Sequence, residues 1–480
     1  MQELHRQRRF KYTEIVDHIS HAIDSGVIPR GGKLPSLRTM SDRYDCSISV
    51  AMQAYRELER MGVAYAQERS GYFAAPSRPV RTPSADARGT NTLQEPVQPV
   101  SILGRIVNAS NDGKLVPLGA GIPDEGLLPL TGLSRSLVRV TRDRPTLLHE
   151  YSDEAGSLTL RRQIARHMVA RGVSVGPEEI LITNGCIEAL SLAIQASTDP
   201  GDAVAVESPV FLGTIQLLTE LRRRIVPVPT SPEDGMDLDS LQDILATDTI
   251  GAIIMTAVHQ NPLGFVMPEE ARRHAVQIAA EHGVPLIEDD IYSETSFDHE
   301  TERPLRSFDQ GDTVIYCSSF SKTLGPGMRI GWLVDGPHQR HTRALKTAST
   351  LGVAPLLQEA LADFLSTARY AHHMKRLQTQ MGHQARALKH MILDTWPDSI
   401  AMTNPAGGYY FWVELPDTVD SLTLFEEALA RGISIVPGQA FGGQDRFRNF
   451  IRLSYGSPVT DRTRAAVEEL GRLIAWGDRS

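Results

Sequence analysis

The chain has little cysteine and no long apolar run. Its three cysteines, Cys46, Cys186 and Cys317, are scattered and odd in number. They form neither a disulfide framework nor a metal-ligand spacing, and such usage is typical of a reducing cytoplasm. No apolar run approaches the roughly 18 residues that suggest a membrane span, and the first residues, MQELHRQRRFKY, lack the apolar core of a signal peptide. We therefore expect a cytoplasmic protein with no metal and no membrane partner.

The composition is that of a globular protein, with 41% hydrophobic and 22% charged residues. A chain of 480 residues is too long for one ordinary domain. The net charge of −9 is unevenly distributed, because residues 1–75 carry 11 Lys and Arg against 9 Asp and Glu while the remainder carries 38 against 49. A slightly basic head on an acidic body is a weak indication that the head meets an anionic partner.

The head has the pattern of three helices and a hairpin. Isoleucines recur every four positions over 11–25 and predict an amphipathic helix. Ser36 is the expected N-cap of a second helix, and Ser47 begins a third helix that runs to about Met61. Residues 63–74 then predict a two-stranded wing. Two short helices joined by a tight turn and followed by a hairpin are typical of a winged helix-turn-helix, the alternative being a small helical module for protein contacts.

The head also resembles the GntR family of bacterial regulators over nearly all of residues 9–75. The motifs that carry the resemblance are Gly32-Lys-Leu-Pro-Ser-Leu-Arg38, Val50-x-x-x-Ala-Tyr55-x-x-Leu58 and Ser70-Gly-Tyr-Phe73. The resemblance implies a double-stranded DNA operator as partner.

Five head residues correspond by that resemblance to DNA-contacting positions. Arg38 and Arg43 would contact backbone phosphate, and Ser47, Ser49 and Gln53 would face bases. One departure is Ile48, where the family commonly has a basic residue, and the loss of one phosphate contact would weaken binding and flatten its salt dependence.

A Pro-rich tract separates head from body. Residues 76–100 contain few aliphatic side chains and no periodicity, which is typical of an extended tether. We predict a DNA-binding domain over 1–75, a flexible linker over 76–100 and a second domain over 101–480, with a small subdomain from about 360 to 480.

The body alternates apolar runs with helical patterns. Most runs are continuous rather than alternating, which favours a mostly parallel sheet covered by helices on both faces. A long helix over 367–394 and further short strands predict a smaller α+β domain at the C-terminal end. The expected strands of the large sheet are 180–183, 203–206, 224–228, 251–255, 284–288, 313–317 and 330–334.

Lys322 follows one of these strands, at the edge where open α/β sheets place ligand sites. A lysine after a strand is usually a solvated surface group, but here the hydroxyls of Ser319 and Ser321 and the guanidinium of Arg329 flank the amine. An amine among cations and away from water has a lowered pKa and can form a Schiff base. Ser319 to Lys322 also spells the S-x-x-K motif of penicillin-binding enzymes, but its S-D-N and K-T-G partners are missing from the sequence.

Other polar residues follow neighbouring strands. Gly185 and Cys186 open a helix whose free N–H groups favour phosphate, Asn261 offers an amide on a turn, and Asp289 and Tyr292 place a carboxylate and a phenol three residues apart. Singly these signals are weak, because an acidic pair after a strand is more often a helix cap and a tyrosine there is usually packing.

Together these residues fit pyridoxal 5′-phosphate (PLP). Its aldehyde needs the amine of Lys322, and its pyridine nitrogen needs a carboxylate such as Asp289 to stay protonated. Tyr292 and Asn261 would serve the phenolate oxygen. Arg329, Ser319 and the Gly185–Cys186 amides would hold the phosphate.

The body resembles the fold-type I aminotransferases over about residues 115–460. The resemblance implies four further roles. Tyr151 would reach the phosphate of a partner subunit in a head-to-tail homodimer, and Phe211, in place of the more usual tyrosine, would cover the cofactor ring. Gly121 belongs to the substrate loop, and Arg452 corresponds to the arginine that clamps a substrate α-carboxylate.

A GntR head, a linker and an aminotransferase body together resemble the MocR-type regulators. The first hypothesis is a transcriptional regulator that senses PLP, an amino acid or an amine. The second is a working PLP-dependent transaminase with a DNA-binding head, which the same residues would serve. The third is a PLP enzyme whose head mediates assembly only.

Overall fold

The computed structural model divides the chain into two compact units. One unit comprises 1–81 with 382–400 and 458–480, and the other comprises 82–381 with 401–457. None of the described helices is long and apolar enough to cross a membrane. The residues that the structure describes are 2–61, 63–67, 70–75, 81–83, 104–106, 108–109, 112–299, 301–443 and 446–478.

The first unit begins with the expected helices. Helix α1 covers Gln2–Asp24, α2 covers Leu37–Arg43 and α3 covers Ile48–Arg60. Ser36 caps α2, since its hydroxyl accepts from the Thr39 N–H at 3.1 Å. Helix α1 begins at Gln2, earlier than the expected start at residue 11. The sequence before residue 11 contains no Gly or Pro that would end a helix.

The predicted stripe of α3 is buried and forms the core of the head. Ala51, Ala54, Tyr55 and Leu58 pack with the isoleucines of α1. The Tyr55 hydroxyl donates to the carbonyl of Pro35 at 2.5 Å and so ties α3 to the segment before α2.

The wing follows α3. Strands β1 (Ala64–Gln67) and β2 (Gly71–Ala74) pair antiparallel, and the Leu34 N–H donates to the Tyr72 carbonyl at 2.8 Å. This confirms the winged helix-turn-helix. Most of the predicted linker, and so its character, lies outside the described residues, and the domain boundaries at 75 and 100 stay predictions.

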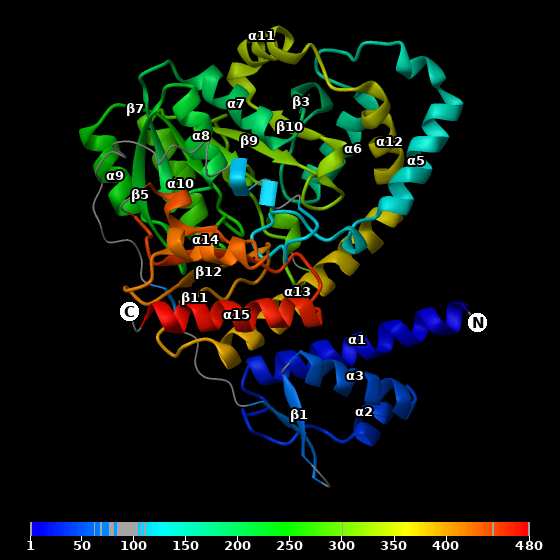
Figure 1. Ribbon diagram of the computed structural model, residues 1–480. Coiled ribbons are helices and arrows are strands. Elements are labelled where there is room, and N and C mark those ends of the chain that lie inside the picture. The colour runs from blue at the N-terminus through cyan, green and yellow to red at the C-terminus, as the bar shows by residue number, and fades with distance from the viewer. Residues whose placement is uncertain are drawn as a thin grey trace. The chain divides into compact units, whose positions relative to one another are not determined.

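The second unit is built on an eight-stranded mixed sheet (Figure 1). The strand order is β3-β10-β9-β8-β7-β4-β5-β6, and β5, β4, β7, β8 and β9 run parallel. Strand β10 runs antiparallel to both of its neighbours, a reversal that the sequence pattern did not indicate. The strands are β3 (Ile180–Thr183), β4 (Ala203–Ser208), β5 (Arg224–Ser231), β6 (Gly235–Met236), β7 (Ile250–Met255), β8 (Leu286–Asp289), β9 (Val314–Ser319) and β10 (Gly331–Val334).

Helices cover both faces of this sheet (Figure 1). They are α5 (Leu130–Asp143), α6 (Leu158–Val169), α7 (Cys186–Ser197), α8 (Leu212–Glu220), α9 (Leu238–Thr247), α10 (Glu269–His282), α11 (Gln339–Thr350) and α12 (Pro355–Leu365). Short 3-10 turns include η1 (Glu125–Leu127), η6 (Pro326–Met328) and η8 (Gly438–Phe441).

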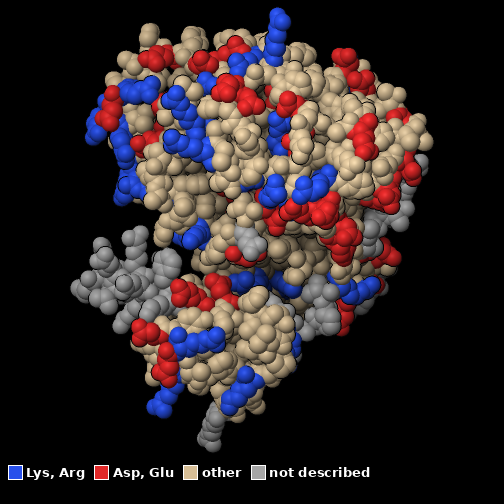
Figure 2. Space-filling model, turned by 180° about the vertical axis from the view of Figure 1, so that it is seen from behind, with Lys and Arg blue, Asp and Glu red and all other residues tan. Residues whose placement is uncertain are grey.

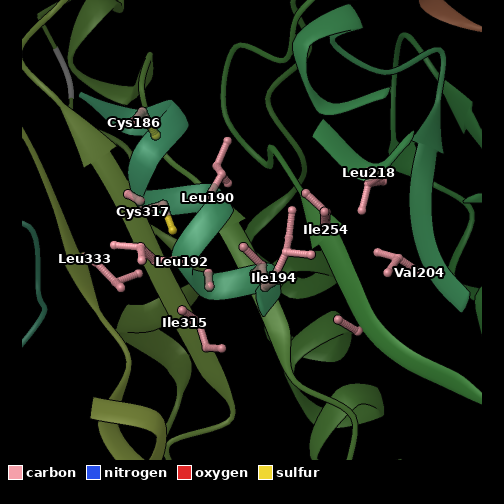
Figure 3. Packing of buried hydrophobic residues seen from close by; sticks show 14 of the residues in the cluster. Cys186, Leu190, Leu192, Ile194, Val204, Leu218, Ile254, Ile315, Cys317 and Leu333 are labelled. Atoms are coloured by element: carbon pink, nitrogen blue, oxygen red, sulfur yellow. The ribbon is translucent and has the colours of Figure 1, made fainter. Parts of the chain in front are cut away.

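The continuous apolar runs are explained by this two-sided burial. Figure 3 shows Leu190 and Ile194 of α7 beside Ile254, Ile315 and Leu333 of the sheet. Alternate residues of the same strands, among them Tyr316 and Trp332, pack on the opposite face with α6 and α12. Because side chains alternate along a strand, burial of both faces explains why successive positions of these strands are apolar, with polar residues such as Asp289 and Ser319 at the strand ends.

A second, four-stranded antiparallel sheet has the order β11-β12-β14-β13. Its strands are β11 (Ala401–Met402), β12 (Tyr410–Glu414), β13 (Val436–Pro437) and β14 (Phe450–Ser454), and the C-terminal helices are α13 (Arg369–Thr395), α14 (Ser421–Ala430) and α15 (Asp461–Gly477). These elements confirm the predicted α+β part and the long helix before it.

Leu190→Ala tests the α7 contact. Leu190 is buried between α7 and the sheet, so we expect the free energy of unfolding to fall by about 2–5 kcal/mol. Urea unfolding followed by tryptophan fluorescence measures it, since Trp332 and Trp412 are buried in the same unit. Val169→Ala, at an exposed position of α6, is the control and should change it by about 0.5 kcal/mol or less. Equal effects would contradict the packing.

Candidate functional site

Three connections meet at one edge of the large sheet. Asn261 follows β7, Tyr292 follows β8 and Lys322 follows β9. The three strands are neighbours and parallel, so their carboxyl ends lie at the same edge. The expected convergence of these side chains is therefore a property of the sheet.

Lys322 is partly buried, and its amine lies against the N-terminal loop. Its Nζ donates to the carbonyl of Gly121 and lies 5.9 Å from the centre of the Tyr292 ring. The carbonyl of Lys322 accepts from the Tyr409 hydroxyl at 2.5 Å, which fixes the backbone behind the amine. The sequence-predicted Lys322 and Gly121 are thus in direct contact.

Asp289 ends β8 and is buried beside Cys186, the first residue of α7. The Cys186 thiol donates to Asp289 Oδ1 at 3.2 Å. Burial raises the pKa of Asp289 to about 6, the thiol and the charge of Lys322 oppose that rise, and the neighbouring carboxylate of Asp290 adds to it. Burial disfavours the charged form of this carboxylate, and a cationic group beside it would stabilise that charged form.

Asp290 has a different task from Asp289. Its carboxylate accepts from Arg171 at 2.5 Å and from the Tyr316 hydroxyl at 2.6 Å, all in the buried interior. This ion pair fixes the end of β8. The sequence alternative of a helix-capping acidic pair is wrong for both residues, because neither carboxylate caps a helix and each meets a buried side chain instead.

The Tyr292 hydroxyl lies in a buried polar chain. Asn261 Nδ2 donates to it at 3.5 Å, and the Tyr410 hydroxyl lies 3.3 Å away. Burial raises the pKa of Tyr292 well above its ordinary value, so it remains a neutral donor.

Arg452, on β14, is buried at the other side of this chain. Its Nη1 donates to Asn261 Oδ1 at 3.0 Å, and its Nη2 donates to the Gly119 carbonyl at 2.9 Å. Its Cζ lies 4.1 Å from the centre of the Tyr410 ring. Nε is buried and has no hydrogen-bond partner among the described residues. The guanidinium is held by neutral groups only, so its positive charge is available to an anion.

The expected phosphate-binding residues gather at the start of α7. Gly185 has φ +84° and Arg329 has φ +51°, both in the left-handed region, and Arg329 Nη2 donates to the Asn184 carbonyl at 2.7 Å. A Cβ added at Gly185 would lie 2.7 Å from Arg329 Nη2, and the φ of +84° would strain any other residue at this position. Ser319 is buried and its hydroxyl accepts from the Ser321 N–H at 3.3 Å.

Phe211 and Tyr151 differ in burial. Phe211 immediately precedes α8 and is partly buried. Tyr151 is 88% exposed, in the loop before α6. Its side chain therefore points to solvent within a single chain.

The five candidate DNA-contacting side chains are all exposed. Arg38 and Arg43 lie on α2, whereas Ser49 and Gln53 lie on α3 after Ser47. The Ser47 hydroxyl makes no cap bond and instead lies 2.8 Å from the Ser49 hydroxyl. The exposed Ile48 lies between them. On the face shown in Figure 2, Lys and Arg side chains are interspersed with Asp and Glu side chains. Binding of a polyanion would therefore depend on the local arrangement of cationic side chains rather than on net charge.

Sequence reasoning missed two tyrosines of the site. Tyr409 and Tyr410 lie in the segment 407–415, whose pattern by itself predicts only one of the short strands near the C-terminal end. The register of β12 on β14 pairs Tyr410 with Ser454 and Trp412 with Arg452, which places Tyr410 on the face of Arg452. Only this register, which is tertiary information, could have identified Tyr410.

Two family models match the chain. Residues 114–470 match the model described as "Aminotransferase class I and II", and residues 11–73 match "Bacterial regulatory proteins, gntR family". The class I and II aminotransferases are a PLP-dependent family.

Relatives cover the chain almost completely. The uncharacterized HTH-type transcriptional regulator YdcR of Escherichia coli K12 is 36% identical, covering 97% of this chain and 99% of its own length. YjiR of the same organism is 33% identical over 97% and 98%. The 2-aminoadipate transaminase of Thermus thermophilus is 28% identical over 83% and 98%.

Solved aminotransferases share the fold of the second unit. The α-aminoadipate aminotransferase LysN of Thermus thermophilus, complexed with N-(5′-phosphopyridoxyl)-L-leucine, has a TM-score of 0.73 at 28% identity and covers 80% of this chain and 96% of its own. A multiple substrate aminotransferase from Thermococcus profundus has a TM-score of 0.72 at 25% identity, over 79% and 96%.

Asp289→Asn tests the burial of the carboxylate. A folded-state pKa of about 6, raised above the unfolded value, means that the native state binds more protons between about pH 4 and pH 6. Wild-type stability should fall as the pH rises through this window, by on the order of 1–3 kcal/mol. The Asn variant lacks this loss, so its stability relative to wild type should increase from pH 4 to pH 6. Urea unfolding of protein stripped of small molecules measures it, and parallel pH curves would contradict the assignment.

Proposed function

Because this chain belongs to the MocR type of HTH-type transcriptional regulators, which join a GntR-family segment to a class I and II aminotransferase segment, we propose that it controls transcription in response to PLP or an amino compound. The observation that carries the proposal is the convergence of Lys322, Asp289, Tyr292 and Arg452 in a chain that also has a winged helix-turn-helix.

The residues present fit PLP as the bound group. Lys322 would hold the aldehyde carbon, Asp289 the pyridine nitrogen, and Tyr292 with Asn261 the phenolate oxygen. The cofactor, when bound, supplies an electrophilic carbon and an electron-withdrawing ring. The raised pKa of Asp289 suits this role, because a cationic pyridine nitrogen would compensate the buried carboxylate.

The phosphate end fits equally. The α7 N-terminus offers backbone N–H groups of Gly185 and Cys186, and the hydroxyls of Ser319 and Ser321 and the guanidinium of Arg329 supply further donors. The space that a Cβ at Gly185 would occupy is bordered by Arg329 Nη2. Phe211 would cover the ring.

A carboxylate is the effector group that the other side of the site favours. Arg452 is buried, paired only with neutral oxygens, and has Nε without a partner in the described part of the chain. Burial lowers the pKa of Arg452, and an anion would relieve that cost. An amino acid brings this anion together with an amine that can replace Lys322 at the cofactor.

The loop at residues 118–124 would report occupancy. It accepts from Lys322 at Gly121 and from Arg452 at Gly119, so both ligand-binding groups hold it. Backbone bonds extend it to the second sheet, where the Ser454 N–H donates to Leu118 at 2.6 Å and the Asp124 N–H donates to Gly456 at 2.8 Å. A ligand that pairs with Lys322 and Arg452 would remove their hydrogen bonds to the loop. Its affinity would then differ between a state in which the loop keeps these bonds and a state in which the loop is released, and allosteric control requires such a difference.

Homodimer formation completes the proposal. Tyr151 is 88% exposed, and the exposed Leu148 shares its loop region. An aromatic side chain of this size in water is typical of an interface. In a head-to-tail dimer Tyr151 would reach the phosphate of the partner subunit, and the two heads would meet two half-sites on DNA.

Transamination is the second candidate function, favoured by the full set of Lys322, Asp289, Tyr292 and Arg452 and by transaminase relatives. Lys322 would then move protons as general base and acid. Repeated turnover of an amino acid with 2-oxoglutarate would support the enzyme, and a stable spectral change without turnover would support the sensor.

Lys322→Ala tests the cofactor site. The variant should lack the visible absorbance of lysine-bound PLP, because the amine assigned to the aldehyde carbon is removed. Absorbance scans of purified protein with added PLP measure this, and Lys375→Ala, on an exposed part of α13, should retain the band. An unchanged spectrum of Lys322→Ala would refute the assignment.

Arg43→Ala tests the DNA-binding surface. Loss of one phosphate contact should weaken binding to random-sequence duplex DNA and reduce the slope of log K against log salt by about 1. Fluorescence anisotropy at several salt concentrations measures both. Arg340→Ala, exposed in the second unit, is the matched control, and an equal loss in both variants would contradict a contact specific to the head.

A further inference from the structure

Tyr410 is a buried phenol at the start of β12 that has no role in the proposal above. Its hydroxyl is 3.3 Å from the Tyr292 hydroxyl, and Arg452 stacks on its ring at 4.1 Å. It therefore touches both the group assigned to the cofactor and the group assigned to the carboxylate.

The hydroxyl also faces the amine. A Cβ added at Gly121 would lie 2.9 Å from Tyr410 Oη and 3.6 Å from Lys322 Nζ. Both polar atoms thus border the same point, at the α-carbon of Gly121. Because glycine carries no side chain, the phenol and the amine can both pack closely against the backbone of Gly121.

The charges around Tyr410 are positive. The titratable groups that face it are Lys322 after β9, Arg452 on β14, Tyr292 after β8 and Tyr455 after β14, with Tyr409 adjacent in its own segment. Burial by itself would raise the pKa of Tyr410, but Lys322, Arg452 and the Tyr292 hydroxyl together hold it below the ordinary value for a phenol. The pKa values of Tyr292 and Tyr455 are shifted upward by burial instead.

We propose that Tyr410 is the proton acceptor for the incoming amino ligand. An amino acid arrives with its carboxylate on Arg452 and its amino group protonated, and an ammonium has no lone pair for attack. The phenolate oxygen of Tyr410 takes one proton, so that an N–H bond breaks, an O–H bond forms and the electron pair stays on nitrogen. The products are a neutral amine and a neutral phenol, and no oxidant or reductant is needed.

This role deepens the proposed function, and the transfer of a proton from the ligand rests on that function. The ionisation of Tyr410 is independent of the proposed function, because Lys322 and Arg452 surround the phenol in the protein alone. The two can therefore fail separately, and the first experiment concerns the ionisation only.

Tyr410→Phe removes the hydroxyl and keeps the ring on which Arg452 stacks. Ultraviolet difference absorbance of phenolate, recorded against pH on the full chain without cofactor, should show one tyrosine of the 12 titrating before the others, below about pH 10. That phase should be absent from Tyr410→Phe. It should persist in Tyr455→Phe, a buried control whose hydroxyl donates to the Gly407 carbonyl at 2.6 Å. Identical titrations of wild type and Tyr410→Phe would overturn the proposal.

A second experiment tests the proton transfer with two probes. Methylamine must lose a proton before it attacks, whereas hydroxylamine is already neutral near pH 7. On PLP-loaded protein the change in the visible absorbance that follows mixing should slow about 100-fold with methylamine in Tyr410→Phe, and stay unchanged with hydroxylamine. Equal slowing with both probes would mean that the hydroxyl positions other groups and accepts no proton, and would overturn the assignment. If PLP does not bind, the proposed function fails while the phenolate titration still decides the ionisation.

Discussion

The paired ends of the connection between β9 and β10 are the constraint on which the site depends. Ser319 and Gly331 are partners across the two strands, so the stretch 320–330, which carries Lys322 and Arg329, begins and ends at one place. A Cβ at Gly331 would lie 2.6 Å from the Gly185 carbonyl carbon and 2.9 Å from the Cys186 nitrogen. The close approach of β10 to the start of α7 therefore places the stretch that carries the amine and the guanidinium beside the helix N-terminus.

Electrostatics then separates the polar side chains into two groups. Asp290, Arg171 and Tyr316 satisfy one another in the interior and hold β8 in place. Asp289, Arg452 and Lys322 hydrogen-bond to neutral groups, namely a thiol, an amide with a carbonyl, and a carbonyl. Buried or half-buried charges that form no ion pair are costly, and a ligand with a cationic nitrogen and anionic groups would reduce that cost. The arrangement favours binding of PLP and an amino acid in either the sensor or the enzyme.

The candidate functional side chains are exposed in the head and mostly buried in the second unit. In the head, apolar side chains of α1 and α3 are buried and the candidate DNA contacts are exposed, so the surface is available to a large polyanion. In the second unit the functional groups are buried around a small volume. The loop at residues 118–124 accepts hydrogen bonds from both Lys322, at Gly121, and Arg452, at Gly119, so it contacts both of these cationic side chains.

Local patterns determined much of this protein. The apolar periods of the head, the Ser36 cap and the continuous strand runs predicted the winged helix and the two-sided sheet, because helix and strand periods and caps are local properties. The polar residues that follow β7, β8 and β9 could be assigned for the same reason, since parallel strands end at one edge. The tertiary structure alone decided the reversal of β10 and the register that places Tyr410 beside Arg452. It also decided which of two adjacent aspartates meets an arginine, since pairing between distant segments depends on packing that no local pattern encodes.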